Sequence, residues 1–149
     1  MATTCLPPDF KDFLRLLNSY GVEYLVIGGY AVGYHGYPRA TADLDIWIAT
    51  SRSNAEKVVE VLRAFGFEVP ELSPELFLQK EKVIRMGVPP IRIEILTTIS
   101  GAEFHRCYPR REVADMDGVE VNIIGLGDLK ANKKASGRHQ DMSDLEHLP

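Results

Sequence analysis

Hydrophobic residues in the first third of the chain recur first at helical and then at strand spacing. A first helix is predicted up to Gly21, because its apolar positions lie three or four residues apart: Phe10, Phe13, Leu14 and Leu17. Residues 23–27 have the composition of a strand, which ends at the pair Gly28-Gly29. Residues 30–37 leave room only for a short helix or turn.

Residues 43–49 alternate between aliphatic and other side chains, which predicts a second strand with one apolar face: Leu44, Ile46 and Ile48. Ser53 and Glu56 have the spacing of a capping box and predict the start of another helix. The buried stripe of that helix is formed by four apolar residues: Val58, Val59, Leu62 and Phe65. Gly66 is expected to end it.

The next region predicts short elements and then a pair of strands. Residues 67–69 indicate a short strand, and Ser73 followed by proline indicates a brief helix to about Gln79. Residues 81–86 and 91–96 then have the composition of paired strands, joined by a turn over residues 87–90.

The last third of the chain predicts a second hairpin followed by helices. The hairpin covers residues 111–124 and turns at Asp117-Gly118, and the helices cover 126–135 and 138–148. Strands and helices in this irregular order favour an α+β fold with a mixed β-sheet and flanking helices. The length of 149 residues predicts one domain over 1–149, with C-terminal helices from about residue 126.

Composition narrows the function classes. The formal net charge of −4 argues against a surface that binds nucleic acid along its whole extent. Cys5 and Cys107 lack the spacing of a zinc site and are interpreted as ordinary thiols, and the scattered histidines suggest no ligand set. No apolar run is long enough for a membrane span, and residues 1–4 do not resemble a secretory signal. We therefore expect a cytoplasmic protein with no membrane partner.

Candidate chemistry begins with two aspartates on the second predicted strand. Asp43 and Asp45 are two residues apart, so both carboxylates project from the same face with their Cα atoms roughly 6 to 7 Å apart. Their mutual repulsion has to be offset either by a divalent cation or by solvent. Taken alone, an Asp-x-Asp pair at an exposed strand end is more often solvated than metal-bound.

A third acid follows on the strand over 91–96. Its isoleucines face inward, and Arg92 and Glu94 face the other side. If this strand lies beside the first acidic strand, Glu94 joins Asp43 and Asp45 in one site. Three carboxylates without a nearby histidine or cysteine favour a hard ion such as Mg²⁺. The alternative is an exposed strand face on which Arg92 and Glu94 simply alternate.

A pair of glycines precedes the acids. Gly28 and Gly29 follow a strand and would let a phosphate approach the backbone closely, although a glycine pair more often only forms a turn. The thirteen residues between Gly29 and Asp43 are enough for one turn of helix and a returning strand. The glycines and the acids would then lie at the same end of the sheet.

This combination resembles the nucleotidyltransferase superfamily, whose fold is that of DNA polymerase β. The matching residues are Gly28-Gly29, Asp43-Leu44-Asp45 and Glu94, which stands where an aspartate is more usual. Residues 28–45 look most like the AbiEii-type toxins and their small relatives. A C-terminal pattern agrees with that resemblance: Leu129, Lys133, Arg138, Asp141 and Asp144-Leu145. The resemblance spans residues 27–145 and does not imply the substrate of those toxins, which continue into a helical domain.

The resemblance implies a catalytic site that transfers a nucleoside monophosphate from a nucleoside triphosphate to a hydroxyl group. Asp43 and Asp45 would hold two Mg²⁺ ions, and Glu94 would share one ion and help to deprotonate the acceptor. Gly28 and Gly29 would contact phosphate through their backbone. The acceptor remains open between a tRNA end, a protein side chain and a small molecule.

Further residues are assigned with alternatives left open. The resemblance marks Lys133 as the cation for the triphosphate, whereas a solvated helix face is an equal reading for Lys130 and Lys134. Arg39 and Thr41 either orient a phosphate or cap the strand that follows. Asp141 and Asp144 are expected to have a structural role, in ion pairs on a helix surface. The alternative function is a non-catalytic nucleotide- or protein-binding module of a toxin–antitoxin pair.

Overall fold

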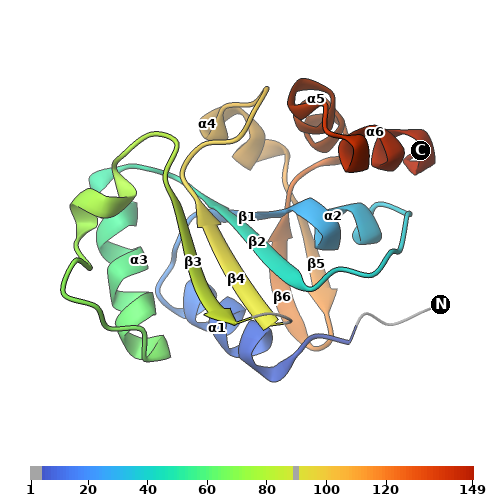
Figure 1. Ribbon diagram of the computed structural model, residues 1–149. Helices are drawn as coiled ribbons and strands as arrows, with labels where there is room; N and C mark the ends of the chain where they lie inside the picture. Colours follow the sequence, from blue (N-terminus) through green and yellow to red (C-terminus); the bar gives the residue numbers. More distant parts are fainter. Residues whose placement is uncertain (1–4, 89–90) are drawn as a thin grey trace.

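A single mixed sheet organises the protein, as seen in a computed structural model that describes residues 5–88 and 91–149, with only the backbone of Val88 (Figure 1). The strands are β1 (Tyr24–Ile27), β2 (Asp43–Ile48), β3 (Val83–Val88), β4 (Ile91–Leu96), β5 (Glu112–Met116) and β6 (Val119–Ile123). They lie in the order β3-β4-β2-β1-β6-β5.

Two predicted hairpins form the two sides of this sheet. β3 pairs antiparallel with β4, and β5 pairs antiparallel with β6, as the sequence predicted. The centre consists of the antiparallel pair β1 and β2, and each central strand joins its hairpin by parallel pairing. The expected α+β fold with a mixed sheet is confirmed.

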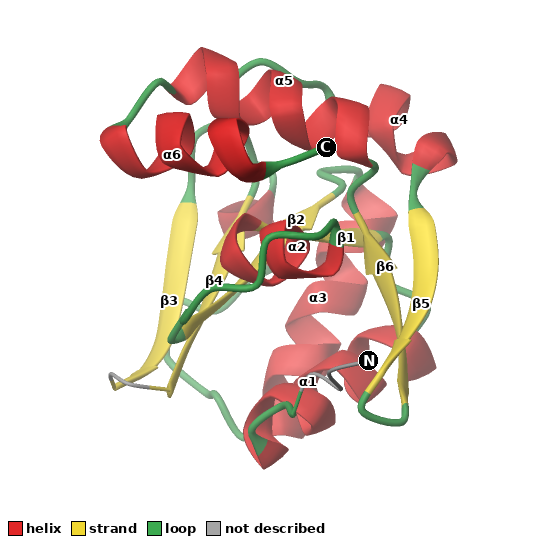
Figure 2. Ribbon diagram, turned by 90° about the vertical axis from the view of Figure 1, so that its right-hand side faces the viewer, coloured by secondary structure: helices red, strands yellow, loops and turns green. Residues whose placement is uncertain are grey.

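Helices cover the sheet in two groups (Figures 1 and 2). They are α1 (Pro8–Ser19), α2 (Gly28–Tyr34), α3 (Arg52–Phe65), α4 (Phe104–Cys107), α5 (Leu126–Ser136) and α6 (His139–His147), with 3-10 turns at Pro74–Phe77 and Tyr108–Arg110. α1 and α3 pack against each other on one side. α4, α5 and α6 gather at the top of the molecule above α2 (Figure 2).

Alternation along β2 separates the core from the site. Leu44, Ile46 and Ile48 are buried, as the sequence predicted. The opposite face carries Asp43 and Asp45 and then Trp47, which is buried against the edge of Phe104 in α4. One strand therefore contributes both to the hydrophobic core and to the acidic surface.

Local signals misplaced two predicted elements. The N-cap of α3 is Ser51, not Ser53: the Ser51 hydroxyl accepts a hydrogen bond from the Asn54 backbone N–H. This earlier start buries Asn54, whose amide bonds the backbone of Glu23 and Ala49 and so ties the helix to the ends of β1 and β2. Residues 67–69 form a loop rather than a strand, and Val69 is exposed.

Two sequence-based expectations fall partly or wholly outside the described residues. The predicted turn over 87–90 is wrong at residues 87–88, which extend β3, and its residues 89–90 lie outside the described residues. The expectation that residues 1–4 carry no secretory signal also lies outside them. Within residues 5–88 and 91–149, no helix has the length and apolar character that crossing a bilayer requires.

Candidate active site

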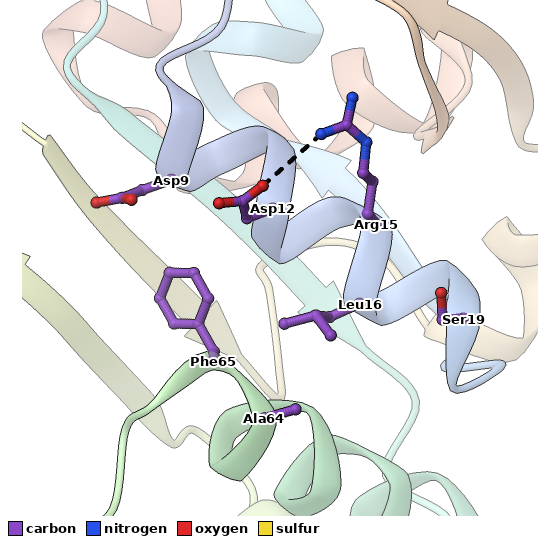
Figure 3. A pocket seen from close by; sticks show the side chains of 7 residues that line it. All are labelled: Asp9, Asp12, Arg15, Leu16, Ser19, Ala64 and Phe65. Carbon is purple, nitrogen blue, oxygen red and sulfur yellow. Dashed lines mark ion pairs between the residues drawn. The ribbon is translucent and has the colours of Figure 1, made fainter.

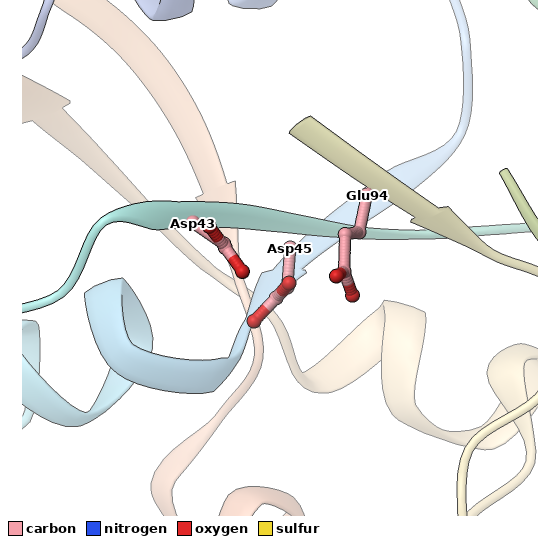
Figure 4. Close-up of side chains that lie close together, drawn as sticks. All are labelled: Asp43, Asp45 and Glu94. Carbon is pink, nitrogen blue, oxygen red and sulfur yellow. The ribbon is translucent and has the colours of Figure 1, made fainter. Parts of the chain in front are cut away.

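Three carboxylates converge where β2 and β4 run side by side. Their parallel pairing places Asp43 beside Arg92 and Asp45 beside Glu94. One oxygen from each of Asp43, Asp45 and Glu94 lies within 4.8 Å of the others, and all three side chains project from the same face (Figure 4). The sequence-based condition for a three-acid cluster, adjacency of the two acidic strands, is therefore met.

Burial and neighbouring negative charges both disfavour the ionised form of Asp45. Burial raises the pKa of the Asp45 carboxyl to about 7, and the negative charges of Glu94 and Asp43 add to that effect. The positive charges of Lys133 and Arg138 act in the opposite direction without cancelling it. The cluster therefore has an excess of negative charge that a bound cation would offset.

Two arginines already neutralise part of the cluster. Arg92 Nη2 donates to Asp43 Oδ2 at 2.8 Å and lies 3.5 Å from Glu94 Oε1. Arg85 Nε donates to the same Glu94 oxygen at 3.1 Å. Among the described residues, these contacts leave Asp43 Oδ1, Glu94 Oε2 and the Asp45 carboxylate without an arginine partner. Each acid thus keeps at least one oxygen for a metal ion.

Gly28 and Gly29 lie against the acidic strand because neither has a side chain. Gly28 has a φ of +68°, and a β-carbon there would collide with Asp45 Oδ2. A β-carbon on Gly29 would lie 2.6 Å from Thr41 Oγ1. The two glycines and the acids do lie at the same end of the sheet, because β1 pairs with β2 and Ile27 lies opposite Asp45.

A buried ionic network covers the site from α5 and α6. Lys133 has only 4% of its surface exposed, and its Nζ lies 3.0 Å from both Asp141 Oδ1 and Asp144 Oδ2. Both aspartates are almost fully buried. The expected structural role of these acids therefore takes the form of a buried network, whereas the expectation of pairs on a helix surface is wrong, because packing of α6 on α5 encloses them.

Two arginines complete the network. Arg39 makes a two-pronged contact with Asp144 through Nε and Nη2, at 2.9 and 3.0 Å, and Arg138 Nε donates to Asp141 at 2.9 Å. Burial alone would raise the pKa of both aspartates, but these hydrogen bonds and those from Lys133 hold each pKa below its usual range. Arg39 thus connects the loop before β2 to α6.

Thr41 supports the start of β2. Its hydroxyl accepts a hydrogen bond from the Asp43 backbone N–H at 3.3 Å, the strand-capping alternative that the sequence left open. Because the same hydroxyl lies against Gly29, this side chain also fixes the distance between the glycine turn and the acidic strand. Thr41 therefore positions Asp43 through the backbone.

A pocket of about 490 Å³ opens in front of these groups. Its lining combines the glycine pair, two of the acids and the cations of the network: Gly28, Gly29, Arg39, Thr41, Asp43, Asp45, Arg92, Lys133, Arg138, Gln140 and Asp141, with Ala40 and Ala42. All eight proposed site residues except Glu94 line it. A ligand with a metal-binding end and several negative charges fits this arrangement of acids and cations.

Three polar residues of this region have contacts that the sequence did not predict: Arg85, Arg92 and Gln140, whose side-chain amide donates to Asp144 at 2.9 Å. The signal for Arg92 was present, since it alternates onto the same strand face as Glu94. Lys130 contacts the carbonyl of Pro149, and Lys134 is exposed.

A second groove of about 550 Å³ lies between α1 and α3 (Figure 3). It is lined by Asp9, Asp12, Arg15, Leu16, Ser19, Ala64 and Phe65. Its one drawn ion pair, between Arg15 and Asp12, is 3.7 Å long and exposed. Such a pair contributes little binding energy, so this groove lacks the converging charges of the acidic pocket.

Comparison with known proteins supports the fold. The structure is similar to that of a Thermotoga maritima protein with a provisional nucleotidyltransferase assignment, with a TM-score of 0.61 and 16% identity over 96% of this chain and 94% of that chain. It is also similar to an antigenic nucleotidyltransferase-like protein of Paracoccidioides brasiliensis, with a TM-score of 0.55 and 17% identity over 93% of this chain and 72% of that chain. No protein-family model and no curated protein matches the sequence. The chain therefore has a nucleotidyltransferase-like fold.

Proposed function

We propose that this protein is a Mg²⁺-dependent nucleotidyltransferase that moves a nucleoside monophosphate from a nucleoside triphosphate to a hydroxyl acceptor. The observation that carries this proposal is the convergence of Asp43, Asp45 and Glu94 within 4.8 Å, on neighbouring strands of a nucleotidyltransferase-like fold. The relationship to AbiEii-type toxins, drawn from sequence motifs, remains part of the proposal.

The donor set suits Mg²⁺. Three carboxylates supply only oxygen ligands, and the negative charges of Asp43 and Glu94, which add to the effect of burial on the pKa of Asp45, favour a divalent cation. Asp43 and Asp45 would hold two ions, with Glu94 sharing one of them. When bound, Mg²⁺ would neutralise charge that develops on the triphosphate and on the leaving pyrophosphate.

The chain's own residues would bind and orient the substrates. The backbone at Gly28 and Gly29 gives phosphate oxygens a close approach, and Lys133 offers a cation whose position is fixed by two aspartates. In the reaction, the acceptor oxygen would form a bond to the α-phosphorus while the bond from that phosphorus to pyrophosphate breaks. Glu94 would take the acceptor's proton on its carboxylate, which lies beside Asp45.

The identity of the substrates rests on this proposal. The nucleotide is a nucleoside triphosphate such as ATP, and the acceptor is a tRNA end, a protein side chain or a small molecule. A cytoplasmic protein with an antitoxin partner chain would fit the toxin–antitoxin resemblance noted in the sequence. Each acceptor class presents a hydroxyl group, the only feature that the reaction requires.

A second candidate function follows from the arginines in the acidic cluster. Arg92 contacts Asp43 and Glu94, and Arg85 contacts Glu94, so two of the three acids are partly neutralised without a metal. This observation favours a non-catalytic module that keeps the fold and binds a nucleotide or a protein partner. Such a module would retain ligand binding and lack turnover.

The direct test incubates the protein with Mg²⁺, each α-labelled nucleoside triphosphate, and total tRNA or cell extract. We expect label transfer with the wild type and none with Asp43→Asn. Asp12→Asn, which changes an exposed aspartate of α1, is the matched control and should transfer label normally. Absence of transfer by the wild type, or equal transfer by Asp43→Asn, would refute the catalytic proposal.

Ligand-induced stabilisation separates the two candidate functions. A binding module without turnover should still unfold at a higher temperature with a nucleoside triphosphate and Mg²⁺, because a ligand that binds only the folded state stabilises it. Stabilisation without label transfer therefore favours the nucleotide-binding module. The absence of both contradicts the enzyme and the nucleotide-binding module, and leaves only a module that binds a protein partner.

A further inference from the structure

Arg92 makes a simpler contact with its aspartate than Arg39 and Arg110 make with theirs. Arg39 and Arg110 each bind one aspartate through both Nε and Nη2. Arg92 instead donates one hydrogen bond, from Nη2 to Asp43. Its Nε is buried and has no hydrogen-bond partner among the described residues. The guanidinium therefore leaves much of its donor capacity unused.

Strand register explains why this arginine lies among the acids. Arg92 and Glu94 alternate onto the same face of β4, and Arg92 lies directly opposite Asp43 on β2. The pairing that brings Glu94 to the cluster therefore also brings a positive charge to it. An arginine at this position occupies space near the same carboxylate oxygens that a metal ion would use.

The position of Arg92 also allows it to turn away. Its side chain is 33% exposed and lines the pocket in front of the acids. A single hydrogen bond from a partly exposed side chain is more easily exchanged for another partner than a two-pronged contact, such as the one between Arg39 and Asp144. Arg92 shares this pocket with the cations Arg39, Lys133 and Arg138, so a multiply charged anion bound there would lie near all four side chains.

We infer that Arg92 is the cation that the acidic cluster holds in the absence of a metal, and that it exchanges Asp43 for the phosphates of a bound polyphosphate. This inference rests on the proposed function, since it requires the cluster to bind a divalent ion. Arg92 would thereby couple the binding of the divalent ion to the binding of the polyphosphate. Without a polyphosphate, Arg92 competes with the ion for Asp43; with a polyphosphate bound, Arg92 pairs with its phosphates and leaves Asp43 to the ion.

Ion binding provides the first test. Trp47, the only tryptophan, follows Asp45 by two residues on the same face of β2, about 7 Å away along the strand. It can therefore sensitise the luminescence of bound Tb³⁺, a hard ion that prefers oxygen ligands, and Mg²⁺ can be titrated by competition. Arg92→Gln should bind either ion about three- to fivefold more tightly than the wild type, the factor expected for one half-exposed ion pair.

Three variants serve as controls for that measurement. Arg92→Lys retains the charge and should stay near the wild-type affinity, whereas Arg92→Met, without charge or hydrogen bonding, should resemble Arg92→Gln. Arg52→Gln removes an arginine from an exposed pair with Glu75 and should change nothing. Unchanged or weaker ion binding by both Arg92→Gln and Arg92→Met would overturn the inference.

Polyphosphate binding provides the second test. Inorganic tripolyphosphate with Mg²⁺ should raise the unfolding temperature of the wild type beyond the effect of Mg²⁺ alone, and this increment should shrink in Arg92→Gln. An equal increment in both proteins would overturn the coupling. Asp45→Asn shows whether Tb³⁺ binds at the acidic cluster, because this substitution should weaken binding there. If neither the wild type nor any Arg92 variant binds Tb³⁺ at this cluster, the proposed function fails as well. Ion binding without an effect of Arg92 refutes this inference alone.

Discussion

The α-carbon of Gly28 abuts the carboxylate of Asp45, so closely that a β-carbon at Gly28 would collide with Oδ2. Antiparallel pairing of β1 with β2 produces this contact, because Ile27 lies opposite Asp45 and the chain turns into α2 at the next residue. The turn also requires a positive φ at Gly28. One residue without a side chain therefore serves both the backbone turn and the acidic site.

Gly28→Ala is expected to damage the site more than the fold. The positive φ alone should cost about 1 to 2 kcal/mol of unfolding free energy. The collision should in addition push the Asp45 carboxylate away and weaken Tb³⁺ binding. Gly66→Ala is the matched control, because Gly66 also has a positive φ but no atom within 4 Å of the added carbon. Equal ion binding by the two variants would contradict this account.

Asp45→Asn should change how stability depends on pH. Burial raises the pKa of Asp45 to about 7 in the folded protein, above its unfolded value of 3.8. The folded state therefore binds the proton more tightly, and the stability gained below pH 4 is lost as the pH rises from about 4 to about 7. Asn cannot ionise, so the variant should avoid that loss.

Urea unfolding at pH 5 and pH 8 without divalent ions measures this effect. We expect Asp45→Asn to gain stability relative to the wild type by roughly 2 kcal/mol at pH 8, after allowance for solvent screening, and by less at pH 5. Asp12→Asn, at an exposed position of α1, should show no such change between the two pH values. A constant difference for Asp45→Asn would show that Asp45 does not titrate in this range.

Glu94→Asp should weaken ion binding although it keeps the charge. The shorter side chain withdraws the carboxylate by about 1.5 Å, away from the cluster that Glu94 forms with Asp43 and Asp45. We expect the affinity for Tb³⁺ to fall by about tenfold or more. Mutation of a residue that only hydrogen-bonds a metal ligand typically lowers metal affinity by that factor, and Glu94 is proposed as a ligand itself. Glu146→Asp, at an exposed position of α6, controls for the substitution itself. Unchanged affinity would remove Glu94 from the ligand set.

Prediction from sequence worked where the signal was local and periodic. Alternation located β2 and assigned Asp43 and Asp45 to one face, and strand composition with turn residues located both hairpins. It failed where tertiary contacts decide. α3 begins after Ser51, where the buried Asn54 bonds the backbone of Glu23 and Ala49, and the four-residue helix α4 is too short to show a period.

The sequence indicated the charged residues of the site but not which of them pair with one another. Spacing suggested that Glu94 could join the aspartates, but the adjacency of β2 and β4 depends on a long-range pairing that spacing cannot reveal. Burial of Lys133 follows from the packing of α6 on α5 and has no signature in its own helix, whose other lysines are more exposed. Sequence thus indicated the charged residues without their pairings.

Lys133→Met should destabilise the protein by about 3 kcal/mol, because removal of one member leaves buried charge uncompensated. Its Nζ lies 3.0 Å from both Asp141 and Asp144, which are almost fully buried. Arg138 and Arg39 would remain as partners of the two aspartates, which keeps the loss at the lower end of the range for a broken buried pair.

A double-mutant cycle distinguishes this network from a set of independent contacts. Asp141→Leu also removes the partner of Arg138, but the Arg138 side chain is 76% exposed and can return to water. The loss in Lys133→Met/Asp141→Leu should therefore be smaller than the sum of the single losses, with a coupling of about 1 to 3 kcal/mol. The exposed pair Arg52 and Glu75 should give a coupling of at most about 0.5 kcal/mol in the same cycle. Additive losses at Lys133 and Asp141 would mean that the buried contact between them contributes nothing to stability, and that Lys133 is held by Asp144 alone.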